Sequence, residues 1–578
     1  MATDWDCDLL VIGSGAGGLS AAVAAAQLGL KVIVAEKEAH FGGTTAWSGG
    51  WMWIPRNPLA RAAGLQEDLH APLSYLKHEL GDQFDETRAL AFLNHGPRMV
   101  EFFQNQTQLQ FIDGNGIPDF HVNTPYASLG GRSVCAAPFD GRALGRHIHH
   151  LKPPLPETTL WGMGIASGAD LRHFMNAMRS LASFWHVAKR VARHWRDVIL
   201  HGRGLHLVNG NALVAALAAS AIAKGVEIRT NSPAKQLISG DVEDNDGNVR
   251  AVVGAVLGSP QGDISVRARC GVVLACGGFP HDEARKKELL PHAPTGREHF
   301  SAASRGNTGD GLRLGEAVGA VVARDLVHAA AMAPVSLVPR RDGTVAHFPH
   351  LLERAKPGLI AVASNGQRFT NEADSYHDFM QGLLRATPSG QTARAWLVCD
   401  HAFIRRYGLG AVKPAPMPLG RWINNGYLQR GANLAELARG CGINAAGLQS
   451  AVTRYNALAA RGKDEDFAKG ETPYNRVQGD AARALAAGWP NPCMAPLQQG
   501  PFYAVKVVPG SLGTFAGLRA NAHAQVLNAA NQPIAGLYAG GNDMNSLMSG
   551  RYPSGGITLG PAMTFGFIAA HHAAGRDL

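Results

Sequence analysis

A tyrosine lies between two glycine pairs close to the C-terminus. Residues 540–560 have the sequence GGNDMNSLMSGRYPSGGITLG, which combines the ionisable phenol of Tyr552 with turn-forming glycines. A phenol can donate a hydrogen bond to a substrate oxygen, and glycines let the backbone approach a ligand closely. The pattern predicts that Tyr552 stands beside a bound cofactor.

The N-terminal end carries a nucleotide-binding pattern. Residues 8–18, DLLVIGSGAGG, form an apolar strand that runs into a G-x-G-x-x-G turn, and an alanine-rich helix then ends at Gly29. The next strand ends at Glu36, near the offset of an acid that hydrogen-bonds a ribose. This carboxylate would repel a 2′-phosphate, so NADP is disfavoured while NAD and FAD stay open. The predicted contacts in the turn are Gly13, Ser14, Gly15, Ala16, Gly17 and Gly18.

A second polar glycine loop follows Glu36 directly. Residues 37–50, KEAHFGGTTAWSGG, could wrap a pyrophosphate or the edge of a flavin ring. A glycine-rich turn without a ligand is the alternative, but the order of strand, turn, helix, strand and acid favours a nucleotide site. The predicted contacts in this loop are Lys37, Gly43, Thr44, Thr45, Ser48, Gly49 and Gly50.

The composition indicates a globular enzyme of several domains. The chain has 578 residues, 69 of them glycine, and a net charge of +9 that would assist an anionic cofactor or a loose contact with acidic lipid. No pattern typical of nucleic-acid binding is present, so no nucleic-acid partner is expected. The seven cysteines contain no C-x-x-C pair and are expected to be reduced, and the histidines show no metal-binding cluster, so no metal is expected.

The sequence favours a cytoplasmic location. No basic segment followed by an apolar run begins the chain, and no 18 apolar residues are contiguous. Between residues 171 and 191, apolar residues recur at helical spacing, and Arg and Lys gather towards the end. We interpret this stretch as a surface helix packed on the cofactor domain, with loose attachment to a membrane as the alternative.

Several motifs together resemble one family. The block E-K-x-x-x-x-G-G-T-T-A-x-S-G-G, WMWIP at 51–55 and GGRSVCAAPFD at 130–140 resemble the fumarate reductase and succinate dehydrogenase flavoprotein superfamily, and within it most closely the flavin-dependent 3-ketosteroid dehydrogenases. The resemblance spans nearly the whole chain. It implies an α/β fold in which a discontinuous, Rossmann-like FAD-binding domain (1–335 and 513–578) carries an inserted α+β cap or catalytic domain (336–512).

The resemblance extends the predicted FAD site to later segments. GVVLACGGF at 271–279 resembles the strand that closes on the adenosine half, GNTGDG at 306–311 a segment that buttresses the flavin, and GLYAGGND at 536–543 a strand beside the ribityl chain. Non-covalent binding is expected, because the GGTT loop lacks the histidine that attaches FAD in some relatives. The contacts implied are Ala275, Gly277, Gly278, Asn307, Asp310, Gly541, Asn542, Gly556, Ile557 and Leu559.

The resemblance also implies a reaction and a role for each group. Tyr552 and the backbone N–H of Gly556 match donors that hold a ketone oxygen, Tyr376 matches the base that removes the α-proton, and flavin N5 accepts the β-hydride. An ordinary phenol, with a pKa near 10, is a poor base at neutral pH. Tyr376 therefore needs a relay or a nearby positive charge.

The relay is where this sequence departs from the family. The Δ1-dehydrogenases supply a further tyrosine from a loop that corresponds to PDFHV at 118–122, where this chain has Phe120 and His121. His121 or Tyr126 could substitute, or Ser554 could act as in Δ4-(5α)-dehydrogenases. The position of the new double bond is therefore open.

The prediction is an FAD-dependent dehydrogenase that desaturates a 3-ketosteroid or a related alicyclic ketone and passes electrons to a quinone or another acceptor. A flavin-dependent reductase of an activated alkene and a non-catalytic flavin-binding protein are the alternatives. Fumarate reduction is disfavoured, because the motif of those enzymes would place its arginine at Pro553 and its histidine at Ser549. Arg368 and Glu372 are interpreted as a structural ion pair, with substrate contact as the alternative. The oligomeric state does not follow from the sequence.

Overall fold

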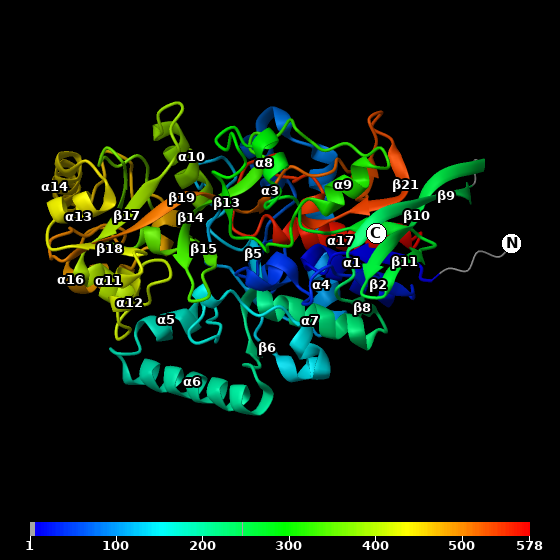
Figure 1. Cartoon of the computed structure of the whole chain (residues 1–578), viewed down its shortest axis with the longest axis horizontal. Helices are drawn as coiled ribbons and strands as arrows, with labels where there is room; N and C mark the ends of the chain where they lie inside the picture. The colour runs from blue at the N-terminus through cyan, green and yellow to red at the C-terminus, as the bar shows by residue number, and fades with distance from the viewer. Residues whose placement is uncertain (1–5, 245–246) are drawn as a thin grey trace.

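A computed structural model describes residues 6–244 and 247–578 of the chain. Two regions, each built around a large sheet, lie next to each other (Figure 1). The first region contains both ends of the chain, blue and red in Figure 1, and the second contains most of the green and yellow middle segment. The predicted α/β class is confirmed.

A six-stranded sheet organises the first region, with the strand order β20-β21-β12-β1-β2-β8. The strands from β21 to β8 are parallel, and β20 joins the edge in the antiparallel sense. The central strands are fully buried, which explains their unbroken apolar sequences. The strands are β1 (Leu9–Ile12), β2 (Val32–Ala35), β8 (Glu227–Arg229), β12 (Val272–Leu274), β20 (Gln525–Leu527) and β21 (Pro533–Ala539).

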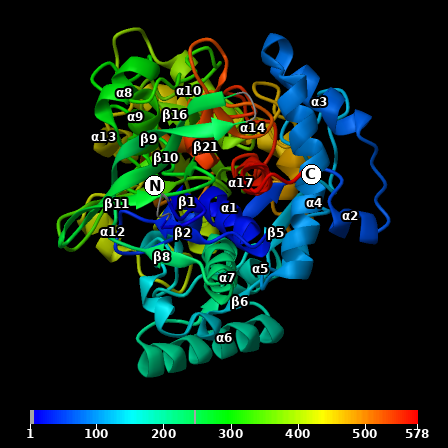
Figure 2. The ribbon, with the colours of Figure 1, turned by 90° about the vertical axis from the view of Figure 1, so that its right-hand side faces the viewer.

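The predicted meeting of the two chain ends is observed. Helix α1 (Ala16–Gln27) packs against both α7 (Asn209–Ala223) and the C-terminal helix α17 (Leu559–Ala573). Figure 2 shows α17 next to α1, with α7 below them. An antiparallel sheet of β9 (Ala234–Asp244), β10 (Gly247–Ser259) and β11 (Gly262–Arg267) packs on β12 and β21.

The second region is built on a seven-stranded sheet. Its main path is β15-β14-β19-β17-β16, and β13 and β18 also pair with β19. β14 and β19 contain the two proposed domain boundaries at 335/336 and 512/513, which stay predictions. The strands are β13 (Phe300–Ser301), β14 (Ala330–Pro339), β15 (Val345–Pro349), β16 (Leu359–Ala363), β17 (Ala395–Cys399), β18 (Leu428–Gly431) and β19 (Phe502–Thr514).

Helices surround this sheet and connect it to the first region. Those of the second region are α10 (Tyr376–Ala386), α11 (His401–Tyr407), α12 (Gly420–Asn424), α13 (Leu434–Cys441), α14 (Ala445–Arg461), α15 (Pro473–Gln478) and α16 (Ala481–Ala487). Further helices are α2 (Pro58–Ala62), α3 (His70–Leu80), α4 (Glu86–Gln106), α8 (Glu283–Leu289) and α9 (Asp310–Glu316). Two small sheets contain β3 (Trp51–Trp53), β4 (Phe111–Asp113), β5 (Ser133–Ala136), β6 (Phe139–Asp140) and β7 (His206–Leu207).

The prediction of a single helix around residues 171–191 is wrong. Two helices form instead, α5 (Ala169–Met175) and α6 (Leu181–His201). Ser180 starts the second helix, because its hydroxyl accepts a hydrogen bond from the Ser183 backbone N–H. Across residues 6–244 and 247–578, no helix has the length and apolarity needed to cross a membrane.

Arg368 and Glu372 form the predicted ion pair. The Arg368 guanidinium donates to both Glu372 and Asp464 at 2.8 Å, and all three side chains are buried. Burial raises the Glu372 pKa, but Arg368 and Lys469 outweigh it and lower the pKa to about 2. The pair belongs to the interior of the second region. Neither residue lines the large cavity at the carboxyl ends of the parallel strands, which is described below.

A histidine joins the two regions. His121 lies 2.7 Å from Glu79 of α3 through Nδ1 and 2.9 Å from Asp378 of α10 through Nε2. Burial lowers the His121 pKa, but the hydrogen bonds and charges of Asp378 and Glu79 outweigh it and raise the pKa to about 10. His121 is therefore a cation at neutral pH that holds α10 against the first region.

This bridge predicts a loss of stability at alkaline pH. The pKa of His121 is about 10 in the folded protein, against an ordinary value of 6.5. The bridge therefore stabilises the folded protein fully below pH 6.5, and this stabilisation is lost as the pH rises to about 10. We expect the free energy of unfolding to fall by roughly 1–3 kcal/mol over this window, after discounting for solvent screening. Denaturant titrations followed by circular dichroism measure it. His121→Gln should show a flatter profile, and an unchanged slope in this variant contradicts the assignment.

Candidate active site

One large cavity, about 1430 Å³ in volume, lies at the carboxyl ends of the central parallel strands. Residues that directly follow β1, β2 and β12 line it, which is where α/β sheets bind nucleotides. The predicted cofactor residues on its wall are Gly13, Ser14, Gly15, Ala16, Gly17, Glu36, Lys37, Gly43, Thr44, Thr45, Ser48, Gly49, Gly50, Ala275, Gly277, Asn307, Asp310, Gly541, Asn542, Gly556 and Leu559.

Glu36 is locked in place at the end of β2. Its carboxylate accepts hydrogen bonds from the Ser14 hydroxyl at 2.5 Å and from the Glu38 backbone N–H at 2.9 Å. Burial raises the Glu36 pKa, and these hydrogen bonds partly offset that rise. The first glycine turn and the acid that follows it are therefore one hydrogen-bonded unit.

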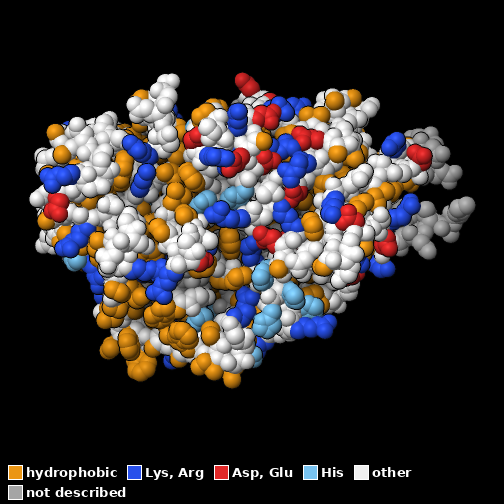
Figure 3. All heavy atoms as spheres, in the orientation of Figure 1, with side chains coloured by type: hydrophobic (Ala, Val, Ile, Leu, Met, Phe, Trp, Pro, Cys, Tyr) orange, Lys and Arg blue, Asp and Glu red, His pale blue; other side chains and the backbone are white. Residues whose placement is uncertain are grey.

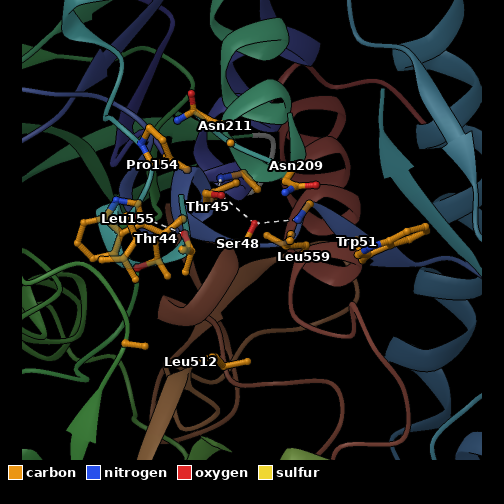
Figure 4. A pocket seen from close by; sticks show the side chains of 18 of the residues that line it. Thr44, Thr45, Ser48, Trp51, Pro154, Leu155, Asn209, Asn211, Leu512 and Leu559 are labelled. Carbon is orange, nitrogen blue, oxygen red and sulfur yellow. Dashed lines mark hydrogen bonds between the residues drawn. The ribbon is translucent and has the colours of Figure 1, made fainter. Parts of the chain in front are cut away.

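The 3₁₀ helix η1 (Gly43–Trp47) connects the glycine loop to the later segments. Asn307 donates to the Thr44 hydroxyl and to the Gly277 carbonyl, both at 3.0 Å, and the Thr45 hydroxyl accepts from the Ala16 backbone N–H at 3.0 Å. Figure 4 shows Thr44, Thr45 and Ser48 beside the cavity, with Leu559 close to Ser48. Segments that the sequence analysis assigned to one cofactor thus meet on one wall.

The wall leaves room for a long cofactor. Gly43 and Gly541 both have left-handed φ angles, +49° and +61°, and a Cβ added at either would meet no atom within 4 Å. Each therefore exposes bare backbone to open space, as a pyrophosphate or ribityl chain requires. The donors and the acid beside them fit a dinucleotide.

Three predicted cofactor contacts lie behind the wall instead of on it. Gly18 packs against the Gly13 carbonyl, and Gly278 is enclosed by Thr514 and Asn542, so neither glycine faces the cavity. Ile557 is 1% exposed and belongs to the hydrophobic core. All three residues pack against other parts of the protein, and their contacts with FAD stay predictions.

Asp543 is likewise structural. Its fully buried carboxylate accepts hydrogen bonds from the backbone N–H groups of Cys276 and Gly278, joining η6 (Gly541–Asp543) to the turn after β12. Burial raises the Asp543 pKa to about 6. Asn542, the residue before it, lines the cavity, where a ribityl hydroxyl could reach it.

Tyr552 is held on the cavity wall by its neighbours. The Pro553 carbonyl accepts hydrogen bonds from the Tyr75 hydroxyl at 2.8 Å and from the Phe120 backbone N–H at 2.9 Å. The Phe120 ring also stacks on the Tyr552 ring, with 5.7 Å between centroids. The turn that carries Tyr552 is therefore fixed before a substrate binds.

Tyr376, the first residue of α10, meets Tyr552 across the cavity. Their rings are 4.9 Å apart in an edge-to-face arrangement, and a hydrogen bond between the two hydroxyls raises the Tyr376 pKa and lowers that of Tyr552. Burial has the larger effect and raises the pKa of both phenols; for Tyr552 the hydrogen bonds with Tyr376 and Thr558 limit the pKa to about 12. Two residues far apart in sequence, one from each region, thus form one phenol pair.

Two further residues of the cavity wall, Tyr474 and Thr558, were not predicted from the sequence. Tyr474 of α15 lines the same cavity, and its ring lies 4.7 Å from that of Phe120. Thr558, also on the wall, hydrogen-bonds Tyr552. Thr558 could have been found from its place two residues after Gly556, whereas nothing in the local sequence ETPYNRV distinguishes Tyr474 from a core tyrosine.

A buried arginine provides the positive charge that the phenols need. The Arg354 guanidinium is 1% exposed and donates to the backbone carbonyls of His350, Leu351, Glu372 and Asp374. All four acceptors are neutral carbonyls, and the charges of nearby Glu353, Asp374 and Glu372 also act on the guanidinium. The Arg354 charge lowers the pKa of Tyr376 and Tyr474, although burial has the larger effect on both.

The three relay candidates do not line the cavity that the phenol pair faces. His121 is committed to its two carboxylates, and Tyr126 is 49% exposed on the surface. Ser554 is buried beside Asp119, and it is absent from the cavity wall. None of the three lines the cavity, so their positions do not support a relay role, and the catalytic role of Ser554 stays a prediction.

The fold and cavity define a nucleotide-binding flavoprotein with a Rossmann-like sheet. The chain matches the family described as FAD binding domain over residues 8–559. It belongs to this FAD-binding family, and the predicted FAD cofactor is confirmed.

Named relatives cover almost the whole chain. A 4-oxocyclohex-2-ene-1-carboxylate 5-dehydrogenase of Sinomonas cyclohexanicum is 38% identical over 99% of this chain and 93% of that enzyme. A 3-oxosteroid 1-dehydrogenase of Mycobacterium tuberculosis is 35% identical over 98% of both chains. The crystal structure of the 3-ketosteroid Δ1-dehydrogenase of Sterolibacterium denitrificans with 1,4-androstadiene-3,17-dione matches with a TM-score of 0.89 and 35% identity, over 98% of this chain and 99% of that one. The predicted resemblance is confirmed.

The first glycine turn yields a prediction about FAD retention. A Cβ added at Gly13 would overlap the Ala275 carbonyl, which would push the turn away from β12. We expect Gly13→Ala to be purified with little FAD, measured as the ratio of flavin to protein absorbance. Gly29→Ala is the matched control, because Gly29 also has a positive φ but open space around it. Equal FAD content in both variants contradicts this role for Gly13.

Proposed function

We propose that the protein is an FAD-dependent dehydrogenase that introduces a carbon–carbon double bond next to the carbonyl of a cyclic ketone. The Tyr376–Tyr552 phenol pair on the wall of the FAD cavity carries this proposal. Relatives named as dehydrogenases of 3-oxosteroids and of oxocyclohexene carboxylates support a 3-ketosteroid or an alicyclic ketone as the substrate.

FAD, when bound, supplies the acceptor for the hydride that leaves the β-carbon. Glu36, Thr44, Thr45, Asn307 and Asn542 would hold it without a covalent bond. The chain must then polarise the ketone and remove one α-proton.

Tyr552 takes the polarising role. Its hydroxyl is fixed by the turn at Pro553 and by Thr558, so it can donate to the ketone oxygen without reorganising. Gly556 lies on the same wall and presents backbone there. The raised Tyr552 pKa, about 12, suits this role, because a donor must keep its proton.

Tyr376 takes the role of the base, with Tyr474 and Arg354 in support. A ketone between Tyr376 and Tyr552 would separate the two phenols, and Tyr376 could then accept the α-proton. The Arg354 charge favours the phenolate forms of Tyr376 and Tyr474. We assign Tyr474 the relay position that the sequence left open, since its ring occupies the Phe120 side of the cavity.

The electrons leave to a quinone or a similar acceptor, and we propose a loose association with the membrane that contains it. The alternative, a reductase of an activated alkene such as fumarate, would need a cation to bind a carboxylate near the flavin. Arg551, the obvious candidate beside Tyr552, is exposed and does not line the cavity. This placement favours a neutral ketone at this end of the cavity.

Anaerobic mixing tests the reaction directly. We expect a 5α-3-ketosteroid, androst-4-ene-3,17-dione, 4-oxocyclohexanecarboxylate or cyclohexanone to bleach the flavin absorbance, because reduction removes the yellow colour. Stopped-flow absorbance measures the rate, and mass spectrometry identifies the unsaturated product. Failure of every cyclic ketone, together with rapid reoxidation of the reduced protein by fumarate or an enoate, would establish the reductase instead.

Substitution of the phenols tests their roles. We expect Tyr552→Phe to lower kcat by roughly 10²–10³, the usual effect of removing one donor to a developing oxyanion, with FAD retained. Tyr474→Phe should lower kcat less and shift the pH dependence of kcat to higher pH, because the relay is lost. Steady-state kinetics across a pH series measure both.

Tyr455→Phe is the control for these variants. Tyr455 is a fully buried phenol in the core of the second region and does not line the cavity. It should retain activity and the pH profile. A Tyr474→Phe variant that behaves like this control removes Tyr474 from the mechanism, and loss of FAD from Tyr552→Phe would make that phenol structural.

A further inference from the structure

Lys356 places a partly buried cation on the wall of the large cavity. It directly follows the 3₁₀ helix η5 (Glu353–Ala355). Its Nζ donates to the backbone carbonyls of Gln478 at 2.6 Å and of Gly479 at 2.8 Å. Because an ammonium group carries three N–H donors, the third is available to a ligand in the cavity.

The surroundings of Lys356 favour an anionic ligand. Burial lowers the Lys356 pKa, and the charges of Asp480 and Glu353 act in the opposite direction. Both carboxylates hydrogen-bond other side chains, Asp480 that of Arg406 at 3.0 Å and Glu353 that of His350 at 2.6 Å. A carboxylate that reached the third N–H would therefore offset the cost of burying this ammonium group.

Helix α15 connects Lys356 to the phenols. Tyr474 and Gln478 are four residues apart in this helix, which corresponds to about 6 Å along its axis. The Tyr474 ring packs against Phe120, which stacks on Tyr552. Lys356 thus lies on the cavity wall about one helical turn beyond Tyr474. A six-membered ring with a ketone and a carboxylate on opposite carbons spans a similar length.

This end of the cavity is open to solvent. Leu352 and Val477 line it, although they are 48% and 53% exposed. Lys and Arg side chains are spread over the face of the molecule in Figure 3, in keeping with the net charge of +9. A positive field of this kind favours the approach of an anionic substrate.

The other basic side chains on the cavity wall are placed differently. Among the described residues, Lys37, Arg172 and Arg203 also line the cavity. Lys37 is paired with Asp310 beside the predicted FAD contacts, Arg203 donates to two backbone carbonyls, and Arg172 is exposed on α5. Lys356 is the one of these four that belongs to the second region, which also carries two of the phenols.

We propose that Lys356 binds the carboxylate of a cyclic keto acid whose ketone lies between Tyr376 and Tyr552. This inference rests on the proposed function and narrows its substrate class from cyclic ketones to anionic ones. The phenols hold the neutral ketone at one end of the cavity, and Lys356 selects for a charge at the other.

The ratio of kcat/KM for two ketones tests this selection. We expect 4-oxocyclohexanecarboxylate to be a better substrate than its methyl ester, which has the same ring but no charge. Lys356→Met should lower kcat/KM for the acid about ten- to hundredfold, the range for a hydrogen bond to a charged group, and leave kcat/KM for the ester unchanged. Lys356→Arg should keep the preference for the acid.

Two results of these kinetics would overturn the proposal. An equal loss with the acid and the ester in Lys356→Met would mean that Lys356 only supports the end of α15. A wild-type protein that prefers the ester, or androst-4-ene-3,17-dione, to the acid would mean that the site selects neutral ketones.

Lys413→Met is the matched control. Lys413 also belongs to the second region and donates to a backbone carbonyl, that of Glu157 at 2.7 Å, but it does not line the cavity. This variant should keep the preference for the acid. If Arg172→Met removes the preference and Lys356→Met keeps it, the carboxylate binds at the opposite wall and the assignment of Lys356 is wrong.

Equilibrium binding separates this inference from the proposed function. Cyclohexanecarboxylate and cyclohexanecarboxamide lack the ring ketone, so neither can be desaturated by the proposed reaction. Calorimetric titration of the FAD-loaded protein should show the acid binding at least about tenfold more tightly than the amide, and Lys356→Met should remove the difference. Equal binding in the wild type overturns the proposal even if ketones bleach the flavin. Tighter binding of the acid without bleaching by any ketone would support the Lys356 site and contradict the proposed function instead.

Discussion

The contact between α1 and α17 is the constraint on which the site depends. A Cβ at Gly17 would lie 2.9 Å from the Gly541 nitrogen, and one at Gly566 would overlap the Gly17 carbonyl. The two helices therefore meet backbone to backbone, without a side chain between them. This approach places Tyr552 and Gly556, from the C-terminal end, at the same cavity as the first glycine turn.

Most of the predicted cofactor residues line one cavity, because the first glycine turn, the acid and the second loop each have a local signal in the sequence. A strand, a glycine turn and an acid at fixed spacing define the position of Glu36, and similar signals place Thr44 and Asn307. Gly18 and Gly278, which do not line the cavity, show the limit of such signals. A glycine motif does not tell whether its backbone faces a ligand or another strand, and only packing decides.

The substrate side was less predictable, since its residues come together only through tertiary structure. Tyr474 and Arg354 lie in unremarkable segments, and their relation to Tyr376 depends on how the second region docks. The same holds for α6. Its apolar spacing was visible in the sequence, but periodicity alone does not say which face is buried, and here the buried face is polar.

The docking of the two regions and the proton chemistry are therefore coupled. The second region carries Tyr376, Tyr474 and Arg354, whereas the first carries Tyr552 and Phe120. A phenolate buried without a nearby cation would be strongly disfavoured, and Arg354 is a buried cation whose charge lowers the Tyr376 pKa. The His121–Asp378 bridge holds α10, and with it Tyr376, in this field. A base that works only when the regions are docked would be inactive in an open protein, where water could quench its charge.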